Sequence, residues 1–311
     1  MNINKYGIVV FLIVLAVLVG PVSAVNWNVN NTSDIQGTIN GASEGDTINF
    51  TSDTGDTYTG FAVSVTKNNL NFFGNGVTLV GGGSSIFKIT NRTGLTIKDF
   101  IININNDTAD GITGNNVYDC TIENNVITNG DDGINIYQRY AGLTIRNNTI
   151  NNVDRDGISL VNHDNLTDEA FNALDPTTIE DNVIQNVVYG IFLGGNFKGD
   201  ITGNTIGGTT AGLTITGKAT TDNGKLNATI SNNNITGIAM ECPRVLSLIL
   251  YDNVISQLGA TGYSILTNGN FGHVSGAIWV VYNQFSAPVD VTFRNSAYAW
   301  ILNFLNGAYY P

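Results

Sequence analysis

A six-residue pattern that returns along most of the chain constrains the fold more than any other feature. Each copy has an aliphatic residue, two variable residues, Asn, one variable residue and a second aliphatic residue. Six copies follow it, namely Ile122–Ile127, Ile145–Ile150, Ile179–Ile184, Ile201–Ile206, Ile230–Ile235 and Leu250–Ile255. Looser copies at Phe72–Val77, Ile97–Ile102 and Val280–Phe285 extend the series at both ends.

The spacing of these copies predicts the architecture. Most begin about 20 to 30 residues after the previous one, which is the length of one coil of a parallel β-solenoid, where each repeat buries its apolar face only against its neighbours. A leucine-rich repeat has a similar period, but it needs a Leu-rich signature and a helical segment in each repeat, and neither is present in the sequence. We therefore predict an all-β solenoid.

The fixed Asn of each copy has a structural explanation. Asn tolerates the left-handed backbone conformation that a sharp bend between two strands requires. Stacked Asn amides can also hydrogen-bond from coil to coil, because the amide both donates and accepts. We expect this ladder to contain Asn125, Asn148, Asn182, Asn204, Asn233 and Asn253, with Asn75, Phe100 and Asn283 at the same place in the looser copies.

A second element follows the hexads and ends in Gly and an aliphatic residue. It occurs at Asp110–Ile112, Asp132–Ile134, Asp156–Ile158, Tyr189–Ile191 and Ala211–Leu213. The Gly is expected to open the next strand after a bend, and the aliphatic residue to turn into the core. The constant register predicts that Asp110, Asp132 and Asp156 stack on adjacent coils at about 4.8 Å per step.

The N-terminus has the composition of an export signal. Lys5 is followed by the unbroken apolar run Ile8–Val19 and by the small residues of Pro21–Ala24, a pattern typical of a secretory signal peptide cleaved after Ala24; a retained anchor is the alternative. No later stretch is long and apolar enough for a membrane helix. These features predict a secreted protein of the extracellular cell surface, without a membrane span after cleavage.

Charge excludes two classes of partner. Charged residues make up 12% of the chain, about half of the usual ~25%. The formal net charge is −12 and the pI is near 4.3, which argues against binding of nucleic acid and of anionic membrane surfaces.

The first predicted elements carry a family resemblance. Asp34–Ala42 is expected to form a short helix with Asp34 as N-cap and with Ile35 and Ile39 on one face. Gly45–Ile48 and Thr57–Tyr58 follow. This order resembles the opening segment of right-handed parallel β-helix proteins of the pectin-lyase-like superfamily, among them NosD-type periplasmic proteins and secreted archaeal surface proteins. The resemblance extends to Phe285 and implies a right-handed parallel β-helix, with little indication of function.

The expected organisation has four parts. Residues 1–24 form the signal peptide, 25–60 the N-terminal cap and first strands, 61–285 the β-helix repeats and 286–311 a C-terminal cap. The end of the chain is aromatic, with Trp279, Tyr282, Phe285, Phe293, Tyr298, Trp300, Phe304, Tyr309 and Tyr310. We expect these residues to cover the last coil; the alternative is a surface that docks a second subunit or a sugar polymer.

Two insertions interrupt the rhythm of the coils. Asn162–Pro176 contains an expected short helix with Thr167 as its cap, and Thr216–Leu226 is a polar loop. Both follow the strand after a Gly-Ile element, so they are expected to emerge on the same side. In solenoids that side is often the binding face.

One set of residues could carry chemistry. It comprises Asp110, Asp131, Asp132, Asp154, Arg155 and Asp156, with His163, Asp164, Asp168 and Glu169 on the adjacent insertion. Carboxylates brought close together raise one another's pKa values, as in glycoside hydrolases, or form oxygen-rich Ca²⁺ sites. The candidates for catalysis are Asp132, Asp156 and His163, and those for Ca²⁺ are Asp110, Asp131, Asp132 and Asp156. The structural alternative is that these carboxylates stand in solvated turns.

The similarity to known enzymes of this fold is incomplete. Asn129–Gly133 is similar to the double-aspartate segment of polygalacturonases, but the Gly-His-Gly and Arg-x-Lys elements of those enzymes are missing. Lyases on this fold use Lys or Arg as base, for which Arg139, Arg155 and Lys198 are candidates. His273 is expected to be structural, and two His and two Met are little ligand material for copper.

The two cysteines do not suit an intrachain disulfide. Cys120 precedes the hexad at Ile122 and Cys242 precedes the hexad at Leu250, so about five coil steps, roughly 24 Å, separate them. They are either buried thiols or links between chains.

The function expected from these patterns is structural or adhesive, as a component of a surface layer, sheath or carbohydrate-binding surface. Expected partners are other copies of the chain, other envelope proteins or polysaccharide. A polysaccharide-active hydrolase, lyase or epimerase is the alternative, and a periplasmic accessory protein is a third.

Overall fold

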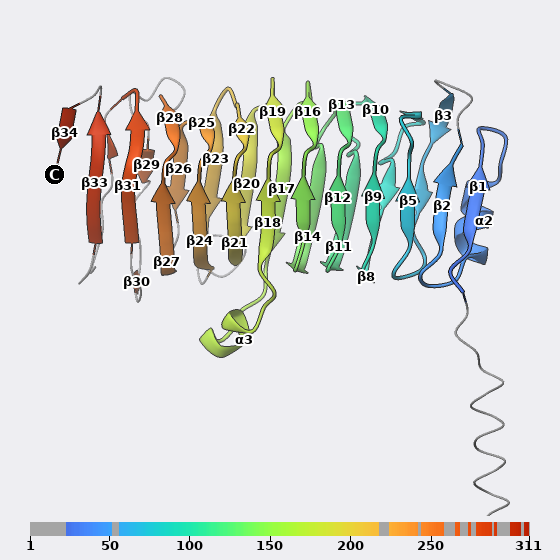
Figure 1. Ribbon diagram of the computed structural model, residues 1–311, viewed down its shortest axis with the longest axis horizontal. Helices are drawn as coiled ribbons and strands as arrows, with labels where there is room; N and C mark the ends of the chain where they lie inside the picture. Colours follow the sequence, from blue (N-terminus) through green and yellow to red (C-terminus); the bar gives the residue numbers. More distant parts are fainter. Residues whose placement is uncertain are drawn as a thin grey trace, which may run out of the picture.

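The protein is a long solenoid whose strands stack along three faces (Figure 1). The computed structural model describes residues 23–51, 56–217, 224–241, 244–257, 265–267, 273–274, 278–287, 289–290, 299–305 and 308–310. The expected signal peptide, apart from its last residues, lies outside this range. Strand pairing between coils is parallel until β34 (Ala308–Tyr310), which runs antiparallel to the strand before it.

The first face carries the strand that begins each hexad. Its strands are β1 (Asn26–Val29), β2 (Thr47–Phe50), β5 (Asn71–Phe73), β9 (Thr96–Lys98), β12 (Thr121–Glu123), β15 (Thr144–Arg146), β18 (Thr177–Glu180), β21 (Phe197–Thr202), β24 (Lys225–Ser231), β27 (Arg244–Tyr251), β31 (Ile278–Phe285) and β33 (Ala299–Leu305), with β30 (His273–Val274) beside β27. We call this the first stack.

The second face carries the strand that ends each hexad. Its strands are β3 (Thr57–Phe61), β6 (Thr78–Gly81), β10 (Ile101–Asn106), β13 (Val126–Gly130), β16 (Thr149–Asn151), β19 (Val183–Gln185), β22 (Thr205–Ile206), β25 (Asn234–Thr236) and β28 (Val254–Ser256), continued by the end of β31. We call this the second stack.

The third face carries the Gly-Ile elements. Its strands are β4 (Val63–Ser64), β7 (Phe87–Lys88), β11 (Ile112–Tyr118), β14 (Ile134–Ala141), β17 (Asp156–Asn162), β20 (Tyr189–Gly195), β23 (Ala211–Thr216), β26 (Ile238–Glu241), β29 (Ile265–Thr267) and β32 (Val289–Asp290), with β8 (Arg92–Thr93) beside β11. We call this the third stack.

The interior is filled by one or two aliphatic residues from each strand. In the coil that starts at β12, Ile122, Ile127, Ile134 and Ile136 are at most 1% exposed, and equivalent residues of other coils pair with them in register. Because side chains alternate across a strand, the residues between these positions face outward. The period-two pattern of the hexad therefore decides which side chains enter the core.

The hexad Asn residues form the predicted ladder. In each step the Oδ1 atom accepts from the backbone N–H and the Nδ2 of the preceding coil's Asn, at 2.8–3.0 Å; the ladder runs through Asn125, Asn148, Asn182, Asn204, Asn233, Asn253 and Asn283. Each Nδ2 also donates to a carbonyl of the preceding coil, such as Asn148 to Ile122 at 2.9 Å. All seven are at most 1% exposed, so the coil-to-coil hydrogen bonding is confirmed.

The backbone role expected of these asparagines was wrong. The left-handed residue is the one before the ladder Asn, as at Asn124 with φ 58° and Asn147 with φ 54°, and none of the seven ladder residues has positive φ. The other coils place Asp99, Asp181, Gly203, Asn232, Asp252 and Tyr282 there. The bend thus uses two adjacent positions, one for the backbone turn and one for the inward amide.

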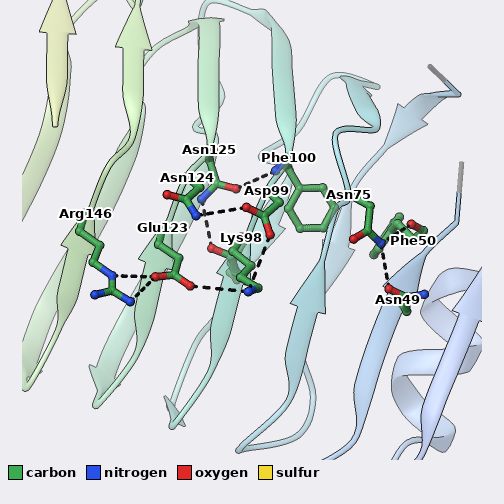
Figure 2. A network of polar contacts seen from close by, with 11 residues as sticks. Asn49, Phe50, Asn75, Lys98, Asp99, Phe100, Glu123, Asn124, Asn125 and Arg146 are labelled. Carbon is green, nitrogen blue, oxygen red and sulfur yellow. Dashed lines mark hydrogen bonds and ion pairs between the residues drawn. The ribbon is translucent and has the colours of Figure 1, made fainter. Parts of the chain in front are cut away.

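Two of the looser copies differ from the pattern. Asn75 is exposed and left-handed, and it donates to Asn49 and to the Phe50 carbonyl instead of joining the ladder. Phe100 stands in the Asn slot, and its backbone N–H donates to Asn125 at 3.1 Å (Figure 2). Its ring packs 5.0 Å from that of Phe50, so an aromatic cluster replaces the amide in the first coils.

The helix expected at the N-terminus is confirmed. α2 (Ile35–Gly41) has Asp34 as its N-cap, accepting from the Gly37 N–H at 2.8 Å, and it buries Ile35 and Ile39. Gln36 exchanges two hydrogen bonds of 2.9 Å with the backbone of Ser64 in β4. The helix therefore closes the open end of the first coils.

At the other end the parallel stacking continues beyond Phe285. β33 pairs in parallel with β31, from Ile278 opposite Ala299 to Phe285 opposite Leu305, and β34 then turns back. Phe285 belongs to the core, while Trp279 and Tyr282 are exposed. Phe293 and Tyr298 lie outside the described residues; Trp300 and Phe304 lie on β33, and Tyr309 and Tyr310 on β34.

Candidate functional site

The stacked aspartates stand at the corner between the second and third stacks. Residues Ile112, Ile134 and Ile158 pair in register, which places Asp110, Asp132 and Asp156 in one column. Asp132 is fully buried and Asp156 is 5% exposed. The alternative of solvated turns is therefore wrong for Asp132 and Asp156. Asp110, in the same column, and Asp131, which precedes Asp132, keep partial exposure.

Arg155 is the cation of this cluster. Its Nε donates to Oδ1 of Asp132 at 3.0 Å and its second terminal nitrogen, Nη2, donates to Oδ2. The Asp156 backbone N–H also donates to Oδ1, at 2.9 Å, and Asp131 lies 3.7 Å from Nη1 of Arg155. Bidentate pairing is the strongest contact between these two groups, so Asp132 is satisfied on both oxygens.

Burial dominates the electrostatics of the carboxyl groups. It raises the pKa of Asp132, which the bond from Arg155 opposes. Burial and the neighbouring charge of Asp132 raise the pKa of Asp156 to about 7 and that of Asp110 to about 6. Oδ1 of Asp156 has no hydrogen-bond partner. The corner therefore combines one tightly paired carboxylate with two that hold protons unusually firmly.

The carboxylates fit a calcium ion poorly. One oxygen each of Asp110, Asp131 and Asp132 lies within 4.8 Å of the others, a spacing that a cation could bridge. Arg155 however already places a positive charge between Asp131 and Asp132 and uses both oxygens of Asp132. A Ca²⁺ ion would have to displace the guanidinium to obtain these ligands.

His163 does not belong to this corner. It follows the far end of β17, whose first residue is Asp156, so roughly 20 Å of extended chain separates the two. The expected grouping of Asp132, Asp156 and His163 on one face is therefore wrong. Strand β17 runs across the third stack from one corner to the other, with Asp156 at its start and His163 just after its end. Asp154 is exposed beside Arg155, and no side-chain contact joins it to the buried column in the described chain.

His163 lines a separate groove at the opposite corner. The groove has a volume of about 440 Å³ and is lined by Asn116, Tyr137, Gln138, Arg139, His163 and Asp164. The rings of His163 and Tyr137 lie 4.7 Å apart, edge to face. Arg139 and Asp164 form an ion pair of 2.6 Å, so the Arg139 expected as a base candidate is occupied by a carboxylate.

The first insertion forms the helix predicted for it. α3 (Asp168–Asn172) begins after Thr167, whose hydroxyl accepts from the Ala170 N–H at 3.2 Å, and it projects from the rod (Figure 1). Asp168 pairs with Arg244, while Glu169 is exposed in the first turn. Lys198 donates to the carbonyls of Asn172 and Leu174 at 2.7 and 2.6 Å, which makes it an anchor of the insertion.

The chain leaves the rod for both insertions at the same corner, as expected; residues 218–223 of the second insertion lie outside the described residues. One lies between β17 and β18 and the other between β23 and β24, so each connects the third stack to the first. Lys225, at the start of β24, is 4% exposed and donates to the Leu166 carbonyl. Sequence reasoning missed Lys225 and Arg244 as anchors because their partners before β18 lie two and three coils away.

Cys120 is buried at the corner between the third and first stacks. It is 1% exposed, and its Sγ accepts from the Leu95 N–H at 3.4 Å and donates to the Tyr118 carbonyl at 3.1 Å. Burial raises the pKa of this thiol to about 11, which makes it unreactive. Cys242 lies outside the described residues, and a disulfide between chains stays a prediction. His273 lies on β30.

These observations define the class of protein as a parallel β-helix with three stacks of strands. A comparison with family models agrees, since the model described as "Right handed beta helix region" matches residues 48–235. The chain belongs to this family of right-handed β-helix proteins. A search of curated proteins finds no match. No helix in the described part of the chain has the length and hydrophobicity needed to cross a membrane.

Proposed function

We propose that the protein is a secreted structural or adhesive component of the cell envelope. The observation that supports this proposal most is the state of Asp132, the central residue of the candidate catalytic set. Its two oxygens accept from Arg155 and from the Asp156 backbone N–H on the next coil. A carboxylate held in this way links two coils, and it is poorly placed to act as nucleophile or base.

The contacts that run along the rod support the same proposal. Ladders of hydrogen bonds run along its axis inside and outside, as between Asn28, Asn49 and Asn75 on the surface at 2.8 Å. A surface ridge of ion pairs joins Lys98, Glu123, Arg146 and Glu180. Contacts that repeat from coil to coil resist bending and shear, which suits a component that carries load or spaces other molecules.

Adhesion has its own candidate surface. Trp279 is 47% exposed on the first stack and Tyr282 is 67% exposed at the adjoining corner. Tyr282 occupies the left-handed position that Asn, Asp or Gly fill in earlier coils. A large ring kept in an unfavourable backbone conformation points to a use on the surface, and exposed aromatic faces are suited to sugar rings.

A polysaccharide-active enzyme is the second candidate. The raised pKa values of Asp110 and Asp156, about 6 and 7, are those expected of proton donors near neutral pH. The two residues stand two coil steps apart, roughly 10 Å, close to the separation of the carboxyl groups in inverting glycosidases. The alternative function, as a hydrolase, lyase or epimerase, rests on the pair of Asp110 and Asp156.

The deciding experiment measures location and turnover together. Antibody labelling of intact cells and fractionation of the producing organism report where the chain resides. The purified protein is incubated with envelope polysaccharide and with neutral and acidic polysaccharides, and released reducing ends and unsaturated products are measured. We expect envelope association and no release. Release by the native chain that disappears in a folded Asp156→Asn variant would favour the enzyme.

A further inference from the structure

The outward surface of the second stack differs from that of the first stack in carrying no charge. The described strands β6, β10, β13, β16, β19, β22, β25 and β28 contain no Asp, Glu, Lys or Arg. The first stack, by contrast, presents the ridge of Lys98, Glu123 and Arg146 that is visible in Figure 2. In a chain of net charge −12, an uncharged face of this length is distinctive.

One row of this face carries four exposed aliphatic side chains among uncharged Thr and Asn residues. Register places Ile101, Val126, Thr149, Val183 and Thr205 opposite one another on successive coils, and Asn234 and Val254 follow. The four aliphatic members are exposed by 39–47%, and they are the only large exposed aliphatics among the strand residues whose side-chain exposure the structure describes. A regular row of this kind is unlike the scattered exposure of an ordinary surface.

The row beside it is polar but partly satisfied within the rod. Asn129 donates to Asn103 at 3.0 Å and Asn186 donates to Asn151 at 2.8 Å. Thr128 and Ser256 bond to carbonyls of the preceding coil. Covering these groups therefore costs less than covering polar groups that depend on water.

We propose that the second stack is the face through which two copies of this chain associate side by side. The inference rests on the proposed structural function and names the surface for its self-association. Two copies of net charge −12 repel, and the strands that would meet through this face carry none of that charge. An identical face has the same coil spacing of about 4.8 Å, so the branched side chains from Ile101 to Thr205 can interdigitate, as in sheets packed face to face.

A second copy suits this face better than a polysaccharide. The strands β6 to β28 of the second stack contain no aromatic residue, and aromatic faces are what a protein surface usually offers to a sugar ring. A twofold axis through the middle of the row would bring the two apolar rows together.

The size of the face predicts a weak contact. Eight strands at about 4.8 Å and three residues of width make a footprint roughly 34 Å long and 10 Å wide. This is well below the ~800 Å² per partner of a typical stable pair. We therefore expect an association that becomes effective when many copies lie side by side on one surface.

The test is sedimentation equilibrium of the purified chain at concentrations up to about 1 mM, which covers the affinity expected of so small a contact. The native chain should associate reversibly. Val126→Lys with Val183→Lys should weaken association at least about tenfold, because like charges would then face each other across the contact. The matched control, Thr121→Lys with Thr178→Lys, adds the same charge to the first stack of the same two coils and should associate more strongly than the first variant.

A second measurement does not depend on the lysine variants folding well. In a Cys242→Ser background, Thr149→Cys lies near the middle of the row, and Thr144→Cys lies on the first stack of the same coil. A flexible bifunctional maleimide should link two copies through Thr149→Cys much faster than through Thr144→Cys. Equal linking rates, a native chain that stays monomeric, or equal association of the two lysine pairs would overturn the inference.

These outcomes separate the inference from the proposed function. A chain that fractionates with the envelope but never associates through this face would refute the inference alone. A chain that associates but also depolymerises a polysaccharide would refute the proposed function alone. Loss of binding to envelope polysaccharide in the Val126→Lys and Val183→Lys variant, with no self-association of the native chain, would assign the face to a sugar polymer and overturn the inference.

Discussion

The seven ladder asparagines show how one residue type can satisfy a buried corner completely. Inside the ladder, as at Asn148, the amide donates to the preceding coil's carbonyl and to the next coil's Oδ1, and its own oxygen accepts twice from the coil before. An amide is the smallest neutral group that both donates twice and accepts twice. Leu would leave N–H and C=O groups buried without partners, and Asp would bring a charge into the core.

Replacing a ladder residue should therefore destabilise the rod. Asn148→Leu leaves the Asn125 N–H and the Ile122 carbonyl without their partners, at about 1–3 kcal/mol each. We expect a total loss of about 3 kcal/mol, measured by chemical unfolding. The control Asn151→Leu changes an outward residue of the same coil and should cost far less. Equal losses in the two variants would refute the role of the ladder.

The buried aspartates should make stability depend on pH in an unusual direction. Burial and Asp132 raise the pKa of Asp156 to about 7, whereas an unfolded aspartate titrates near 4. The native state binds this proton more tightly, so the stabilisation is complete below pH ~4 and is lost as pH rises through ~7. Asp110 contributes in the same direction.

Asp156→Asn should remove much of this dependence. We expect the variant to melt at a higher temperature than the native chain at pH 8 and at a similar temperature at pH 4, because the uncharged amide avoids the cost of a buried anion. Thermal unfolding at both pH values measures it, with the exposed Asp154→Asn as control. A loss of stability of the same size at both pH values would show that ionisation of Asp156 is not what limits the native chain.

Among the elements, the Gly-Ile strands reveal why Gly recurs. We expected these glycines to serve a bend, but Gly111, Gly133, Gly157 and Gly190 have no positive φ. A Cβ at Gly133 would lie 2.6 Å from the Gly157 carbonyl oxygen, and the equivalent contacts at the other three are 2.5–2.6 Å. Close approach of adjacent coils, and not backbone freedom, requires Gly at the start of the third stack.

Gly133→Ala should accordingly cost stability. The added methyl group would also lie 2.6 Å from Cγ2 of Ile150, so two coils must shift, and we expect a loss of about 1–3 kcal/mol. Gly41→Ala is the matched control, because nothing lies within 4 Å of its added Cβ and Ala favours the helix α2 by up to ~1 kcal/mol. Unfolding midpoints that move in the same direction would contradict this explanation.

At the scale of the whole molecule, the two ends of the rod are the places where strand edges and core would be open to solvent without a cap. α2 covers the first coils with Ile35 and Ile39, and Gln36 bonds to the edge strand β4. Without such a cover, the open coil could pair with the end of another rod. The cap therefore determines whether copies meet end to end or only side by side.

Opening the cap should change the mode of assembly. Ile39→Lys places a charge in a fully buried position, so α2 should detach and leave the first coil uncovered. We expect oligomers that grow with concentration and resist the Val126→Lys and Val183→Lys changes, as measured by light scattering and electron microscopy. Gly41→Lys, at an exposed position of the same helix, should behave as the native chain; oligomers in that control would show that the helix does not protect the end.

The fold could be predicted from the sequence because a solenoid turns a short pattern into tertiary structure. Each coil stacks on the coil before it, so a period of one coil and a two-residue alternation specify strands, register and core. The ladder from Asn125 to Asn253 and the column of Asp110, Asp132 and Asp156 follow from spacing alone. Asn75 departs from the prediction because its coil has an additional turn, which the hexad spacing does not reveal.

Only the three-dimensional structure decided the chemistry of the candidate site. The pairing of Asp132 with Arg155, the burial of Asp156 and the separation of His163 from both depend on which corner of the coil each side chain leaves. Arg244 and Lys225 reach the α3 insertion across several coils. Repetition along the chain fixes where coils stack, whereas contacts at the corners and between insertions involve residues that do not repeat, so their geometry exists only in the folded molecule.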